Sequence, residues 1–109
     1  AMGQGELSAT GLEMASHTTL TIELIKGKTI AGPRIETSDE LITVASGTPM
    51  ERATAEAFAQ LILWMESEHG WNRWRAYDLL THVAEMSLGY YEGGGLAVKV
   101  PKKYVAHPS

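Results

Sequence analysis

The sequence predicts an α+β fold in which an antiparallel or mixed β-sheet carries a two-helix hairpin on one face. Segments with alternating apolar and polar residues lie before and after two helical segments. Only a few residues separate the helical segments, so they should pack antiparallel to each other. The 109 residues suffice for one domain with one core, which we expect over residues 1–104, followed by a tail at 105–109.

Three strands are expected before the helices. Residues 18–25 alternate most clearly, with leucine and isoleucine on one face and threonine and glutamate on the other. A strand of mixed character is expected at residues 7–14, and the short connection at 15–17 would join the two as an antiparallel pair. Residues 41–45, which are rich in β-branched side chains, predict the third strand.

Capping residues mark both helices. Thr48 is expected at the N-cap of the first helix, with proline at the first helical position and Glu51 completing a capping box. Gly70 supplies a C-terminal stop. Asn72 is expected to cap the second helix, which should continue through an apolar face to Gly89.

The glycine triplet at residues 93–95 separates the helices from a last strand at 96–100. A phosphate-binding loop needs a strand before the glycines and a helix after them. The triplet lacks that context, so it predicts a turn or hinge.

Composition narrows the classes of partner. The net charge of −4 with dispersed basic residues argues against nucleic acid and anionic lipid as partners. No apolar run is long enough to span a bilayer. The absence of cysteine excludes disulfides and thiolate metal sites, and it is compatible with the cytoplasmic location that we expect.

The histidines and tryptophans favour structural roles. The histidines share no ligand-like spacing on one helix; they are His17, His69, His82 and His107. The tryptophans cluster at the helix–helix junction and are expected in the core or in a subunit interface, with substrate stacking as the alternative. These residues are Trp64, Trp71 and Trp74.

Glu6 is the candidate catalytic residue and metal ligand. It follows Gly3 and Gly5, where flexible backbone would let a substrate approach a carboxylate without side-chain obstruction. The alternative is that Glu6 is a solvated carboxylate near a chain end.

Several segments together resemble the C-terminal part of the acetamidase/formamidase family. Residues 1–13 are similar to the family's His-Ala-x-x-Gly-Asp-Gly-Glu segment and the small residue, glycine and glutamate that follow it. Residues 23–28 and 33–37 match its next strand and loop, and 41–47 and 76–80 resemble a later strand and the second helix. The resemblance covers roughly residues 1–101 in order.

This resemblance implies a hydrolase that converts short linear amides, such as formamide or acetamide, to ammonia and a carboxylate. Family members are about three times this length and usually oligomeric, and their upstream half carries a His/Gly/Asn/Asp loop that helps to build a divalent metal site. Glu6 would lie at that site as ligand or base, with zinc or calcium as the ion. The expected partners are a small amide substrate and either further copies of the chain or a missing N-terminal part.

Two positions depart from the family pattern. Gln4 stands where the family usually has an aspartate, and Glu85 also replaces a common aspartate. A second hypothesis therefore stays open, in which the chain is a non-catalytic, truncated domain with a structural or oligomerisation role. An unpaired sheet edge would favour self-association in that case.

Overall fold

The structure of the chain is a computed structural model that describes residues 3–8 and 10–108. Its centre is a four-stranded sheet with the order β1-β2-β4-β3, in which every neighbouring pair is antiparallel. The strands are β1 (Arg34–Glu36), β2 (Glu40–Ala45), β3 (Glu85–Tyr90) and β4 (Gly95–Pro101). The strands predicted at 41–45 and 96–100 are confirmed as β2 and β4, the two central strands.

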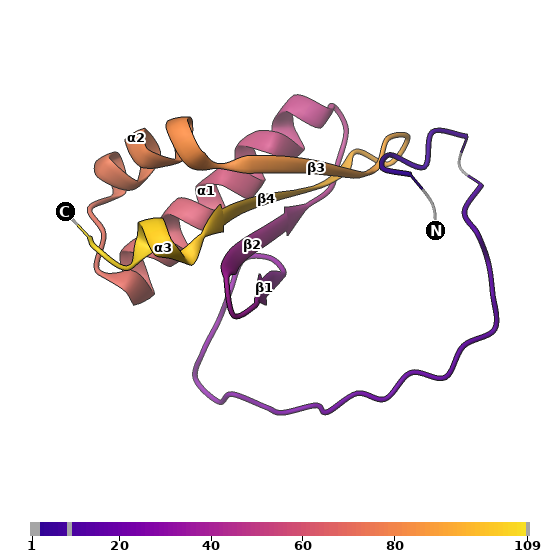
Figure 1. The fold of residues 1–109 in the computed structure, drawn as a ribbon, viewed down its shortest axis with the longest axis horizontal. Coiled ribbons are helices and arrows are strands. Elements are labelled where there is room, and N and C mark those ends of the chain that lie inside the picture. Colours follow the sequence, from indigo (N-terminus) through magenta and orange to yellow (C-terminus); the bar gives the residue numbers. More distant parts are fainter. Residues whose placement is uncertain (1–2, 9, 109) are drawn as a thin grey trace.

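The helices pack on one side of this sheet (Figure 1). They are α1 (Met50–His69), α2 (Arg73–Val83) and the short α3 (Lys102–Val105). The longest helix, α1, crosses β2 and β4, and α2 packs against α1 as the second helix of a hairpin. The predicted α+β class is confirmed. Within the described residues, no helix is long and apolar enough to cross a membrane.

The core lies between α1 and the two central strands. Alternate residues of β2 and β4 are buried against α1, as a strand with one covered face requires. The largest fully buried side chains are Leu41, Thr43, Leu61, Met65, Val98 and Val100. The one hydroxyl among them is satisfied, because Thr43 Oγ1 donates a 2.7 Å hydrogen bond to the carbonyl oxygen of Ala57.

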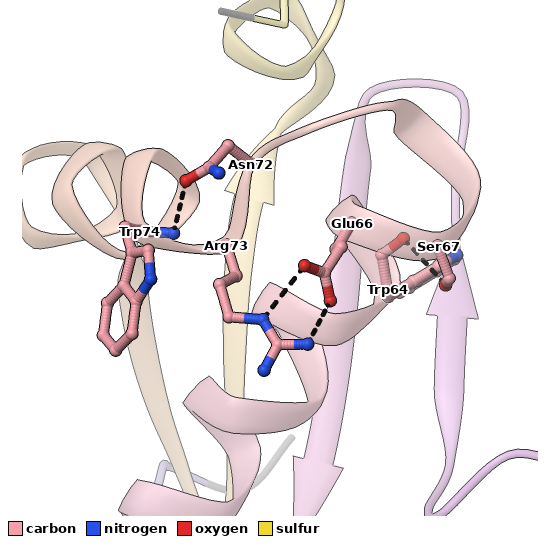
Figure 2. Close-up of polar contacts among 6 residues, drawn as sticks. All are labelled: Trp64, Glu66, Ser67, Asn72, Arg73 and Trp74. Carbon is pink, nitrogen blue, oxygen red and sulfur yellow. Dashed lines mark hydrogen bonds and ion pairs between the residues drawn. The ribbon is translucent and has the colours of Figure 1, made fainter.

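The helix junction follows the capping rules (Figure 2). Gly70 adopts a left-handed conformation (φ 72°), and its N–H donates to the Met65 carbonyl, as predicted for the C-terminal stop. The side chain of Asn72 accepts hydrogen bonds from the amides of Trp74 and Arg75, which confirms the predicted cap of α2. Arg73 bridges back to α1 through two hydrogen bonds of 2.9 and 2.7 Å to Glu66.

Two predictions about helix ends are wrong. The first helix begins at Met50 with Pro49 at the N-cap, and no side chain caps it, so Thr48 and Glu51 form no capping box. The second helix ends at Val83 instead of Gly89, because residues 85–90 pair with β4 as strand β3. A neighbouring strand satisfies the backbone groups of that segment, and tertiary pairing then overrides helix propensity.

None of the described residues of the strands predicted at 7–14 and 18–25 lies in a strand; the first range includes Ala9, which is outside the described residues. Residues 10–33, called the arm below, contain neither helix nor strand and run from the N-terminal segment to β1 in a wide arc (Figure 1). The radius of gyration of 15.4 Å exceeds the roughly 13 Å expected for a compact domain of this size. A strand needs a partner for its backbone groups, and the described part of the chain supplies none beside the arm.

The chain end returns to the core through α3. Val105 is buried, and its carbonyl accepts a 2.9 Å hydrogen bond from the indole N–H of Trp71. We call the four strands and three helices together the body. The body therefore includes Val105, the first residue of the predicted tail. Ala1, Met2, Ala9 and Ser109, which fall in the first block of the resemblance and in the tail, lie outside the described residues.

Candidate functional site

The backbone around Glu6 is fixed in an unusual conformation. Gly5 has a φ of 95° and Glu6 a φ of 40°, and Glu6 is the one non-glycine residue with positive φ among the described positions. An L-residue pays roughly 1–2 kcal/mol for this region, so surrounding contacts must hold it. The carbonyl of Gly5 accepts a 2.7 Å hydrogen bond from the amide of Tyr91, in the turn between β3 and β4. Glu6 is thereby attached to the end of the sheet.

Close packing also requires glycine at position 5. A Cβ added to Gly5 would lie 3.3 Å from Leu88 Cδ2, which is tighter than an ordinary contact. The residue is buried and Glu6 beside it is half-buried. The backbone at Glu6 is therefore packed against the sheet, and the choice between a catalytic and a solvated carboxylate stays a prediction.

A second carboxylate lies near that of Glu6. A Cβ added to Gly11 would lie 3.4 Å from Glu6 Oε1 and 3.5 Å from Glu13 Oε1. The two oxygens therefore cannot be further apart than the sum of these distances. Two carboxylates therefore lie together near the end of the sheet, and carboxylates are among the groups that act in general acid–base catalysis.

Tyr90 brings a phenol to the same end of the sheet. Its hydroxyl lies 3.3 Å from Glu92 Oε2, to which it donates a hydrogen bond. The negative charge of Glu92, with smaller contributions from desolvation and from the charge of Glu6, raises the pKa of Tyr90. The raised pKa keeps the phenol protonated at neutral pH, so its hydroxyl can donate a hydrogen bond.

An open depression of about 480 Å³ adjoins this cluster on the sheet. Gln4, Leu88, Tyr90 and Ala97 are among the residues that line it, whereas Glu6 is not. The depression is mostly apolar because strand side chains form its floor. It offers room for a small apolar group beside the carboxylates.

The described residues do not form a metal site by themselves. No group of three or more histidine, aspartate or glutamate side chains within residues 3–8 and 10–108 is arranged to hold an ion. An ion bound by Glu6 would need ligands from outside these residues, because zinc takes about four ligands and calcium six to eight.

The histidines are not brought together. His17 lies in the arm, His69 in the last turn of α1 and His82 in the last turn of α2. The ring of His69 lies edge-on to Trp64, with 6.1 Å between ring centres. A cation at a helix C-terminus is favourable without any catalytic role. The structural role expected for the histidines stays a prediction.

The tryptophans separate into two kinds. Trp64 and Trp71 are buried in the core, and the guanidinium of Arg34 lies 4.9 Å from the centre of the Trp64 ring. Trp74 is exposed on α2, as Figure 2 shows. The core assignment therefore describes two of the three.

Sequence reasoning missed Glu13 and Tyr90 as neighbours of Glu6, and Glu92 as the partner of Tyr90. The signal for Glu13 is its position two residues after Gly11, since a glycine leaves room for carboxylates to approach. Nothing in the sequence indicates that Tyr90 lies near Glu6. Its position depends on β3, in a segment where the sequence predicted the end of the second helix.

A solved structure provides the comparison that bears on function. No protein-family model matches the chain, and no curated protein matches it. The chain is similar to the crystal structure of an acetamidase from Yersinia enterocolitica, with a TM-score of 0.89 and 33% sequence identity. The similarity covers 96% of this chain but 32% of that chain. The chain therefore has an acetamidase-like fold and spans about a third of the length of that acetamidase.

Proposed function

We propose that this chain is part of a hydrolase that cleaves the carbon–nitrogen bond of short linear amides such as formamide and acetamide. The observation that carries the proposal is the similarity to an acetamidase along 96% of the chain, at 33% identity. The arrangement around Glu6 adds independent support, because backbone strain in proteins concentrates at functional sites.

Glu6 is the proposed proton-transfer group. As water attacks the amide carbonyl carbon, the Glu6 carboxylate accepts a proton from that water, and the proton then passes to the leaving nitrogen. The carbon–nitrogen bond breaks, giving ammonia and a carboxylic acid that ionises. Glu13 and Tyr90 would adjust the charge around Glu6, since both lie near it.

The size of the proposed substrate fits the adjoining surface. The depression beside Glu6 has a volume of about 480 Å³ and a largely apolar lining, so it could receive the methyl group of acetamide. The proposal includes a divalent ion bound by Glu6. Its other ligands would come from outside the described residues, which contain no complete ligand set. The proposal also includes assembly of the enzyme as a homo-oligomer.

The test is release of ammonia from formamide and acetamide. It is measured on the isolated chain and on a longer polypeptide that contains it, with and without added zinc or calcium. We expect Glu6→Gln to lower kcat at least 100-fold, which is the usual contribution of a general base. The matched control is Glu51→Gln, an exposed carboxylate in the first turn of α1, which should leave kcat unchanged.

Two results would contradict the proposal. One is absence of turnover in the longer polypeptide, and the other is equal activity of wild type and Glu6→Gln. The competing function is that of a non-catalytic domain with a structural or oligomerisation role. It is favoured by the limited coverage of the acetamidase, and it predicts a folded protein without turnover in either form.

A further inference from the structure

The arm carries an apolar strand face that the described residues leave uncovered. Leu20, Ile22 and Leu24 alternate with polar residues and are 74%, 88% and 83% exposed. In β4, which has the same alternation, the corresponding apolar side chains are buried. Three neighbouring exposed residues on one face of an extended segment constitute an interaction surface more often than a scattered apolar residue does.

The backbone of the arm is equally unpartnered. Among the described residues, no amide or carbonyl group of 18–25 forms a backbone–backbone hydrogen bond. The segment is extended and contains threonine and isoleucine, which favour strands. It therefore has both requirements for adding to the edge of another sheet, namely free backbone groups and alternating side chains.

The chain is attached to the body on both sides of the arm's middle. Before the arm, Gly5 bonds to Tyr91 as described above. Near its C-terminal end, Glu68 of α1 forms salt bridges of 2.9 Å with Lys28 of the arm and 2.7 Å with Arg34 of β1. Between these attachments the chain follows the wide arc of Figure 1, in which Leu20, Ile22 and Leu24 are exposed, whereas Glu23 and Ile25 line an open pocket with Trp64 and Glu68 of α1. The docking segment is thus projected at a defined place on the molecule.

The comparison indicates what the arm meets. The similarity to the Yersinia acetamidase covers 96% of this chain, and the arm is much longer than the small uncovered remainder, so most of the arm is included in the match. An extended segment whose apolar face is uncovered has no reason to keep one course in two proteins. The acetamidase chain has about two thirds of its length outside the match, which is enough to supply the contacts.

We propose that residues 18–25 are a docking strand that adds to a sheet edge in the part of an acetamidase-like fold that this chain does not cover. The receiving surface should have a free strand edge and an apolar patch for Leu20, Ile22 and Leu24. This proposal concerns assembly and does not depend on the proposed activity.

Hydrogen exchange tests the proposal directly. The probe is the Yersinia acetamidase from which the matched segment has been deleted, co-expressed with this chain. In the chain alone, amides of residues 18–25 should exchange at unstructured rates at every concentration, while those of β2 and β4 are protected. In the complex, exchange of residues 18–25 should slow at least 100-fold, with little change in β2 and β4.

Two neighbouring variants distinguish the apolar face from the polar one. Ile22→Asp should weaken the complex at least 10-fold, and Thr21→Asp should change its affinity less than threefold. Both positions are exposed in the chain alone, so neither change should affect its folding. Equal effects of the two variants would overturn the proposal.

Two other outcomes would also overturn it. The first is a complex in which residues 18–25 remain unprotected. The second is protection in the chain alone that grows with concentration, since a second copy would then be the occupant. If the two pieces fail to associate, exchange is measured in one polypeptide in which this chain replaces the matched segment. Fast exchange of residues 18–25 beside a protected β2 and β4 would again reject the docking strand.

Discussion

The arm and the central strand β4 have the same alternation of apolar and polar residues, but the apolar residues are exposed in the arm and buried in β4. In β4, Leu96, Val98 and Val100 alternate with half-buried residues and are almost completely buried against α1. In the arm, Leu20, Ile22 and Leu24 alternate just as regularly and are almost completely exposed. Alternation therefore specifies which residues share a face, whereas the presence of neighbouring strands and a covering helix decides whether that face is buried.

The difference has a physical cause in the neighbours of each segment. β4 pairs with β2 on one side and β3 on the other, so its backbone groups are satisfied and its apolar face meets α1. Residues 18–25 of the arm form no backbone–backbone hydrogen bond in the described residues, and no helix covers the face of Leu20, Ile22 and Leu24. The body should therefore respond to mutations as a packed core does, and the arm should respond only when a partner is present.

The largest contrast is expected between two leucine deletions. Leu61→Ala removes a fully buried side chain of α1 and should lower the free energy of unfolding by about 2–5 kcal/mol. Leu20→Ala, the matched change in the arm, should alter it by less than about 0.5 kcal/mol in the isolated chain. Urea unfolding of both variants measures the difference. A cost above 1 kcal/mol for Leu20→Ala would mean that the arm packs in the isolated chain.

The next prediction tests whether α3 belongs to the body. Trp71→Phe keeps an aromatic ring but removes the indole N–H that donates to the carbonyl of Val105. Leaving that buried acceptor unpaired should cost about 1–3 kcal/mol. Urea unfolding measures this cost. When residues 105–108 are deleted, Trp71→Phe should cause no further loss of stability, because the acceptor is then gone. An unchanged stability in Trp71→Phe would place α3 outside the cooperative body.

A smaller, local effect is expected where the arm's N-terminal side meets the sheet. Gly5→Ala places a Cβ at a φ of 95° and close to Leu88, at a cost of about 1–2 kcal/mol. This should reduce the protection of the Tyr91 amide roughly 5–30-fold in hydrogen exchange, while β2 and β4 are unaffected. Gly3→Ala is the control, because a Cβ there meets no atom within 4 Å. Equal protection in both variants would contradict the attachment.

The sequence predicts most of the body because its signals there are local. β-Branched side chains indicate β2, and alternation indicates β4. Gly70 and Asn72 mark the helix junction because each acts on the backbone next to it. β3 was not predicted, since its strand state depends on pairing with β4, a contact between distant residues. The absence of the strand at 18–25 has the same origin, because a strand pattern contains no information on whether its partner is present.

The candidate site shows the same division. Glycines beside a carboxylate point to Glu6, and the structure adds that Gly5 and Glu6 both have positive φ. The approach of Tyr90 and Glu13 could not be predicted, since it depends on the β3–β4 turn and on the course of the arm. The metal ligands and the role of Glu6 stay predictions, because the described residues contain too few donors to complete a site.

The smallest expected effect is an acid-dependent loosening where the arm's C-terminal side is attached. The hydrogen bond from Lys28, with its positive charge and that of Arg34, lowers the pKa of Glu68 below its ordinary value of 4.5. A lowered pKa stabilises the folded state above pH 4.5, and this contribution is lost as the pH falls through the folded-state pKa. Because the Glu68 side chain is 36% exposed, the effect should stay below about 1 kcal/mol. Urea unfolding of wild type and Glu68→Gln should therefore differ at pH 7, and the difference should shrink as the pH falls below 4.5. A difference that is the same at every pH would show that the charge of Glu68 does not attach the arm.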